Sequence, residues 1–172
     1  MARTDVGRAA RQEAAEYRQG EERPLGTYVG ALSAYGVLAG GLAGAAWLTG
    51  RRLPREVAPL DLLLMALTTH KLSRLIAKDP VLSPLRMPFT RFEGVSGPAE
   101  LSEDVRGHGL RHGIGELITC PFCMAQWVAT GYVGGLVFAP RGTRLFGAMM
   151  TAVACADWLQ LGYAWLQRRA EG

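Results

Sequence analysis

The chain has 172 residues, of which 49% are hydrophobic and 20% are charged, and by these averages it could be one ordinary soluble domain. Its 19 basic residues are interleaved with 15 acidic ones and form no stripe with aromatic residues, so no nucleic-acid partner is expected. Three cysteines exclude an extracellular disulfide framework. The charges cluster, however, and the long uncharged segments between the clusters predict an integral membrane protein.

Residues 1–26 form a polar N-terminal arm with too few apolar residues to build a core. We expect this arm to fray or to lie along lipid headgroups. No short cationic start leads directly into an apolar core there, and no small-residue cleavage site follows one, so a cleaved signal peptide is not expected.

The first predicted span covers residues 27–50, which contain no charged residue, against the about 20 apolar residues needed to cross a bilayer as a helix. Gly36, Gly40 and Gly44 share one face of this helix and would let another helix approach closely, in the GxxxG manner. Self-association through this face is one possibility. The other is that small residues are simply common in membrane helices.

The second predicted span, residues 57–76, has a polar second half with His70, Lys71 and Arg74. These side chains fit if that end emerges at the cytoplasmic interface, where long cations extend their charged heads to water. The second span therefore crosses the membrane only if its cationic end reaches the cytoplasmic interface.

A central loop is predicted over residues 77–116, where prolines forbid a long helix. Apolar residues mixed with Arg86 and Arg91 predict a segment that lies against the membrane surface. The acidic stretch 100–104 is expected to be solvated. The prolines are Pro80, Pro84, Pro88 and Pro98.

The last two spans, 117–139 and 145–166, are uncharged except for Asp157 and form a tight helical hairpin, followed by a tail at 167–172. The arm, the central loop and the tail carry most of the 19 basic residues, which places them in the cytoplasm. The predicted fold is therefore an all-α bundle of about four transmembrane helices in the bacterial inner (plasma) membrane. Both termini are cytoplasmic in this arrangement.

An aspartate in mid-bilayer costs roughly 2.5–3.5 kcal/mol, so Asp157 is expected to face the helix bundle. Gln126 reaches about the same depth on the third span and is its expected hydrogen-bond partner. With Arg74 or Arg86 paired to Glu116, these residues make a predicted buried polar cluster. Transport through Asp157 and Gln126 is a weaker alternative, because bulky aliphatic side chains leave little room for a pathway.

Cys120 and Cys123 lie near the cytoplasmic end of the third span, and Pro121 between them suits a first helical turn. Thr119 or Cys120 would then cap the helix. The simplest interpretation is two small side chains that pack in the bundle. A second is dithiol redox chemistry, because Cys-Pro-Phe-Cys is similar to the glutaredoxin motif.

A third interpretation is a metal site, since His108, His112, Cys120 and Cys123 offer two imidazoles and two thiolates. Such a set suits tetrahedral zinc. Cys155 or His70 could substitute for one of these ligands. The sequence therefore leaves the cofactor unknown, and zinc and no metal both fit.

Three sequence blocks resemble an uncharacterised bacterial membrane family, domain of unknown function 1360, over roughly residues 58–166. The blocks are Thr69–Ile76, Ser83–Thr90 and Gly115–Cys123 with Gln126-Trp127. The resemblance implies an inner-membrane protein, with some members linked to sporulation and no assigned reaction. It also implies a signature that leaves out His108 and His112 and so disfavours the two-histidine zinc set. The signature residues are Arg74, Arg86, Glu116, Cys120, Cys123, Gln126 and Trp127.

The sequence contains no hydrolase motif, phosphate-binding loop or nicotinamide fingerprint, so no catalytic or cofactor-binding residues are expected. The prediction is a non-enzymatic structural or assembly protein. Its partners would be the lipid bilayer and either a second copy or another membrane protein. The alternative is a thiol-based metal-binding or redox site at Cys120 and Cys123.

Overall fold

The computed structural model describes residues 2–19 and 24–171, and most of them are helical. Five helices are long: α1 (Ala2–Arg18), α2 (Leu25–Leu48), α3 (Pro59–Lys78), α6 (Pro121–Phe138) and α7 (Pro140–Glu171). Short elements fill the segment between α3 and α6. They are η1 (Pro80–Leu82), α4 (Ser83–Arg86), β1 (Thr90–Gly97), β2 (Glu100–Val105) and α5 (Leu110–Thr119).

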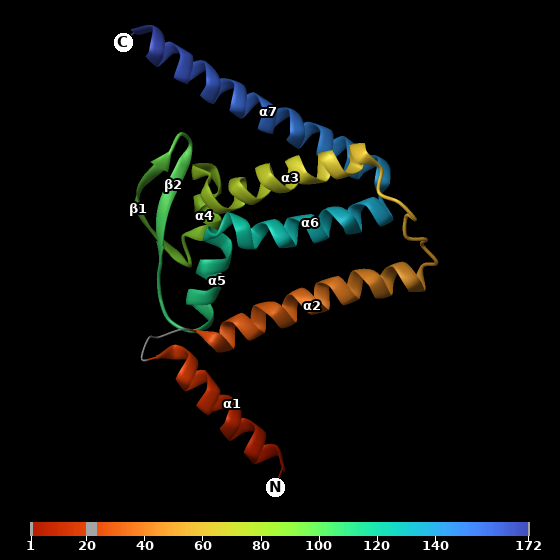
Figure 1. Ribbon diagram of the computed structural model, residues 1–172, viewed down its shortest axis with the longest axis vertical. Helices are drawn as coiled ribbons and strands as arrows, with labels where there is room; N and C mark the ends of the chain where they lie inside the picture. Colours follow the sequence, from red (N-terminus) through yellow and green to blue (C-terminus); the bar gives the residue numbers. More distant parts are fainter. Residues whose placement is uncertain (1, 20–23, 172) are drawn as a thin grey trace.

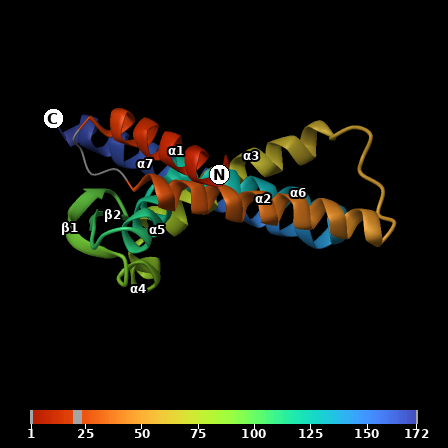
Figure 2. The same cartoon turned by 90° about the horizontal axis from the view of Figure 1, so that it is seen from below.

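The long helices α2, α3 and α6 run alongside one another between two ends of the molecule (Figure 1). The β-hairpin, α4 and α5 gather at one end, which we call the hairpin end, and the connection from α2 to α3 lies at the other. Helix α7 packs on α3 and α6 and then leaves the bundle at an angle. Figure 2 shows the hairpin and α4 set off to one side of the helices.

Local sequence sets the helix ends. Pro59 and Pro121 each occupy the first turn of a helix, where the missing amide proton costs nothing. Asp61 lies in the first turn of α3 and Lys78 in the last, which matches the helix dipole at both ends. Pro80 then prevents α3 from continuing.

The hairpin corrects the prediction of an all-α fold, in which residues 77–116 were a central loop without strands. Strands β1 and β2 pair antiparallel from Thr90 opposite Val105 to Gly97 opposite Glu100, with two irregularities in the register. The acidic stretch 100–104, expected to be solvated, forms most of β2. The β-signal was hidden because the glycines and charges of this segment break a simple apolar–polar alternation.

The third predicted span, 117–139, is not one continuous helix. The chain breaks at Cys120, whose φ of −97° and ψ of 107° are extended, so α5 and α6 are separate helices. The fourth helix is longer than predicted, because α7 begins at Pro140 and includes the tail through Glu171. Within the described residues, two helices, α2 and α7, are long and apolar enough by length and composition to cross a membrane.

Helix α3 has the reverse of a soluble helix's pattern. It buries Asp61 and Thr68, whereas Leu60, Leu62 and Leu63 are exposed. The buried apolar residues are few and mostly small, and two of them, Leu64 and Ala77, also lie on α3: Ala46, Leu64, Ala77, Tyr132 and Ala154. Helix α3 therefore turns several polar side chains toward its neighbours, while three leucines near its start face outward.

Glycine packing joins α3, α6 and α7. A Cβ on Gly147 of α7 would lie 2.3 Å from the hydroxyl oxygen of Tyr132 on α6. The Gly147 carbonyl accepts a hydrogen bond from the hydroxyl of Thr68, at 3.3 Å, and Thr68 is completely buried. The three helices thus meet where only a glycine fits.

We expect Gly147→Ala to destabilise the protein by about 1–3 kcal/mol, the usual cost of overpacking. Tyr132→Phe should cost little, because among the described residues its buried hydroxyl has no hydrogen-bond partner. The double variant should recover part of the Gly147→Ala loss, since the closest clashing atom is gone. Denaturation midpoints in detergent would measure all three, and an additive double variant would contradict this packing.

The predicted close contact at Gly36, Gly40 and Gly44 is wrong within the chain, because no described atom outside α2 lies within 4 Å of a Cβ built there. Helix α6 instead approaches another face of α2, where the side chain of Leu42 lies 3.1 Å from a Cβ on Gly134. The small residue that permits close approach is on α6 rather than on α2.

Candidate functional site

Arg86 is the most buried charged residue that the structure describes, at 1% exposed. Its Nε donates to the Glu103 carboxylate on β2 at 2.5 Å. Its two terminal nitrogens donate to the carbonyl oxygens of Ile76 and Asp79, each at 2.9 Å. One guanidinium therefore joins the end of α3, the short helix α4 and the hairpin.

A second ion pair, between Arg74 on α3 and Glu100 on β2, also attaches the hairpin to α3. Arg74 and Arg86 were correctly predicted to form ion pairs, but the predicted carboxylate, Glu116, was wrong. The partners lie on β2, because the hairpin folds back over α3 and brings Glu100 and Glu103 to these arginines. Two ion pairs thus attach the hairpin to α3 and α4.

Glu116 has a different role, in joining α5 to the start of α2. It accepts a hydrogen bond from the Tyr28 hydroxyl at 2.7 Å. His112, one helical turn before it, lies 3.5 Å away. Nearby, Gly113 packs so closely on Thr27 that an added Cβ would lie 2.2 Å from the threonine methyl group.

Of the two predicted cap residues, Thr119 and Cys120, it is Cys120 that caps α6. Its sulfur accepts a hydrogen bond from the backbone amide of Cys123 at 3.3 Å, and Pro121 occupies the first turn. Both cysteines are free thiols, and Cys123 is exposed. The geometry gives Cys120 a structural role that does not depend on thiol reactivity.

Cys120→Ser should retain stability, because serine is a better cap acceptor than cysteine, whereas Cys120→Ala should lose up to about 1 kcal/mol. Denaturation midpoints of the two variants in detergent would measure the difference. If serine proved as harmful as alanine, the sulfur itself would be required, and the redox or metal interpretation would gain support.

The predicted zinc ligands do not gather. His108 precedes α5, His112 lies beside Glu116, and Cys120 and Cys123 follow the break between α5 and α6. In the part of the chain that the structure describes, no group of three or more His, Cys, Asp or Glu side chains is placed to hold a metal ion.

A cleft of about 600 Å³ opens between α3, the hairpin turn and α7. Lys71 donates to the Asp157 carboxylate at 2.5 Å inside it. His70 packs against Trp158, with 5.8 Å between the ring centroids. The Asp157 side chain is 43% exposed, so the cleft admits water to this ion pair.

Asp157 faces the bundle, as predicted, but its expected partner is wrong. Gln126 donates to the Tyr35 hydroxyl on α2 at 2.7 Å, so it lies on the side of α6 away from Asp157. Gln126 and Asp157 were paired because they lie at equal depth in the membrane. Whether two side chains meet also depends on which side of its helix each one occupies.

At the opposite end of the bundle, the two Arg144 nitrogens Nε and Nη2 donate to the two carboxylate oxygens of Asp61, at 2.7 and 2.8 Å. This bidentate pair was not predicted from the sequence. Asp61 lies near the start of the second predicted span, and Arg144 lies in the connection between the third and fourth. Opposite charges near the starts of two helices were the signal that could have indicated this ion pair. Together with the ion pair between Lys71 and Asp157, this pair joins α3 to α7 at two places along the helices.

These observations define a mostly helical protein, with two helices long and apolar enough to cross a membrane and an ion-paired hairpin fixed to one end. The chain belongs to the family described as protein of unknown function (DUF1360), whose model matches residues 64–163. It is 33% identical over 112 residues to the sporulation protein YjcA of Bacillus subtilis (strain 168), covering 63% of this chain and 95% of that protein. No solved structure matches the chain.

Proposed function

We propose that this chain is a four-span protein of the bacterial inner membrane that presents its hairpin to the cytoplasm as a docking platform for a protein partner. The observation that carries the spanning arrangement is the reversed pattern of α3. In water, a helix that buries Asp61 and Thr68 and exposes three leucines would be unfavourable. In a membrane the same arrangement is favourable, because the leucines contact lipid and the polar side chains find partners inside the bundle.

The other helices support the same arrangement. Helix α6, the shortest of the four, has 18 residues, within the range of about 17–25 that spans a bilayer. Large side chains on α2 and α7 point outward, among them Val37 at 75% and Leu159 at 75% exposed. An apolar surface of this extent requires lipid or a protein partner.

The orientation follows from the charges. The hairpin end carries the basic residues of the central loop, and the end of α7 carries Arg168 and Arg169. With the arginines of the N-terminal arm, which leads into the hairpin end of α2, most of the 19 basic residues then lie on one side, which is the cytoplasmic side by the positive-inside rule.

The docking role is supported by the rigidity and surface of the hairpin. Arg74 and Arg86 fix β2, whereas Phe92 and Val95 on β1 are 66% and 73% exposed. A rigid strand with exposed apolar side chains and an open edge suits strand addition by a partner. The relative's name links that protein to sporulation, and we propose an assembly role for this chain in the same kind of process.

A photoreactive amino acid in place of Phe92 tests the platform in living cells. We expect one discrete protein adduct, which Val95→Asp in the same chain removes and which Val81→Asp, at a site 82% exposed on η1, leaves unchanged. Adducts with lipid alone, or an adduct that survives Val95→Asp, would overturn the docking role.

A further inference from the structure

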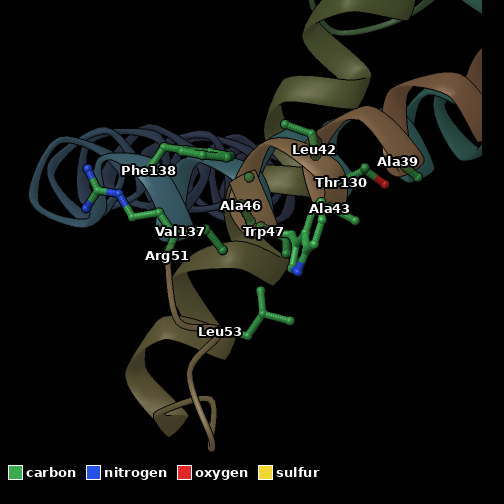
Figure 3. A pocket seen from close by; sticks show the side chains of 12 residues that line it. Ala39, Leu42, Ala43, Ala46, Trp47, Arg51, Leu53, Thr130, Val137 and Phe138 are labelled. Atoms are coloured by element: carbon green, nitrogen blue, oxygen red, sulfur yellow. The ribbon is translucent and has the colours of Figure 1, made fainter. Parts of the chain in front are cut away.

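A groove lies between α2 and α6 (Figure 3), at the end of α2 that lies farther from the hairpin in Figure 1. It encloses about 390 Å³. Ala39, Ala43 and Ala46 line its α2 wall at positions i, i+4 and i+7, which share one helix face. The groove exists because these three side chains are too small to fill the space between the helices.

The lining of the groove offers almost no free polar group. Thr130 is its hydroxyl-bearing residue on α6, but that hydroxyl donates to the Gln126 carbonyl at 2.9 Å and lies 3.0 Å from the Tyr35 hydroxyl. The remaining α6 wall includes Val133 and Val137. A ligand along these walls must therefore be apolar over most of its length.

Arg51 is the exception, since it lines the groove from the chain that follows α2. Among the described residues, no carboxylate pairs with its guanidinium. Arg52 and Arg55 follow in the same connection. One end of an apolar groove thus carries an unpaired cation that can bind an anionic group.

The geometry points to an anionic phospholipid as the occupant, with an acyl chain in the groove and its phosphate at Arg51. The assignment rests on the proposed four-span arrangement, which places this end of α2 at the outer interface of the membrane. Trp47 lines the groove and is 80% exposed, as expected of an aromatic residue at headgroup level. An arginine suits the phosphate because it donates two hydrogen bonds to it in parallel.

Trp47 also provides the test, as the sole tryptophan of a variant with Trp127, Trp158 and Trp165 changed to Phe. The protein is placed in phosphatidylcholine nanodiscs that contain increasing fractions of brominated phosphatidylglycerol or, separately, brominated phosphatidylcholine. We expect brominated phosphatidylglycerol to quench Trp47 at an about fivefold lower fraction, the factor expected for one basic residue at an anionic lipid. Arg51→Gln should remove this preference, and Ala43→Leu should reduce quenching by filling the groove.

Leu48→Trp in a chain with Trp47→Phe is the matched control, because Leu48 is the next residue, 78% exposed and outside the groove lining. It should be quenched equally by both lipids. Equal quenching of Trp47 by both lipids would overturn the lipid site and leave the span intact. Protection of Trp47 alone would mean that a second copy or another protein covers the groove, and absence of quenching at both positions would contradict the span itself.

Discussion

Arg86→Met should destabilise the protein by about 3–5 kcal/mol, the usual cost of removing one partner of a buried ion pair. The change leaves the Glu103 carboxylate, whose side chain is 6% exposed, without its cation. It also leaves the carbonyl oxygens of Ile76 and Asp79 without the donors that reach them at 2.9 Å. Unfolding midpoints in detergent, together with protease cleavage within residues 90–105, would measure the loss.

Arg91→Met is the matched control, because Arg91 is exposed on β1, and it should cost almost nothing. Glu103→Gln in the Arg86→Met background should recover part of the loss, since the stranded charge is gone while the two carbonyls stay unsatisfied. Arg86→Lys should fall in between, because one ammonium cannot reproduce the guanidinium's fixed fork of donors. Equal midpoints for Arg86→Met and Arg91→Met would contradict this account of the hairpin.

Lys71→Met should cost roughly 2.5–3.5 kcal/mol if the pair lies at membrane depth, because it leaves the Asp157 carboxylate uncompensated in a spanning segment. The cleft admits water to Asp157, whose side chain is 43% exposed, so the lower part of this range is expected. Asp157→Asn should restore most of the stability of the Lys71→Met chain. Denaturation midpoints in detergent and in lipid bicelles would report both effects.

Lys78→Met is the control for that experiment, since Lys78 closes the last turn of α3 without an ion pair among the described residues. The size of the stability loss in Lys71→Met also indicates where the ion pair lies. A solvent-exposed ion pair contributes only about 0–1 kcal/mol, so a loss that small for Lys71→Met would place the pair in water rather than between membrane helices.

The long helices could be predicted from the sequence because a long segment with few or no charges can be recognised without knowing which residues it contacts. Segments 27–50 and 57–76 correspond to α2 (Leu25–Leu48) and α3 (Pro59–Lys78) with small shifts. The cap at Cys120 was predictable for a similar reason, since Pro121 confines a helix start to one place.

The ion-pair and hydrogen-bond partners of individual side chains were harder to predict, because they depend on how the elements are placed in three dimensions. Arg86 was identified as a cluster member, but its carboxylate lies on a hairpin that the sequence pattern did not reveal. Gln126 and Asp157 were paired by depth alone, whereas rotation about α6 turns Gln126 toward Tyr35. The family relationship, by contrast, was recognisable from short ordered blocks and is confirmed over residues 64–163.

In the proposed arrangement, four helices cross the membrane and leave the hairpin and the end of α7 on the cytoplasmic side. Single cysteines introduced into a chain with Cys120→Ser, Cys123→Ser and Cys155→Ala test it directly by labelling with a membrane-impermeant maleimide. The four positions are exposed and lie toward one end of the bundle or the other: Arg55→Cys, Ser96→Cys, Arg141→Cys and Gln167→Cys.

We predict that Arg55→Cys and Arg141→Cys are labelled in cells whose inner membrane is intact, and that Ser96→Cys and Gln167→Cys are labelled only after that membrane is permeabilised. Labelling of Arg55→Cys and Ser96→Cys from the same side would contradict the crossing of α3 and, with it, the four-span arrangement.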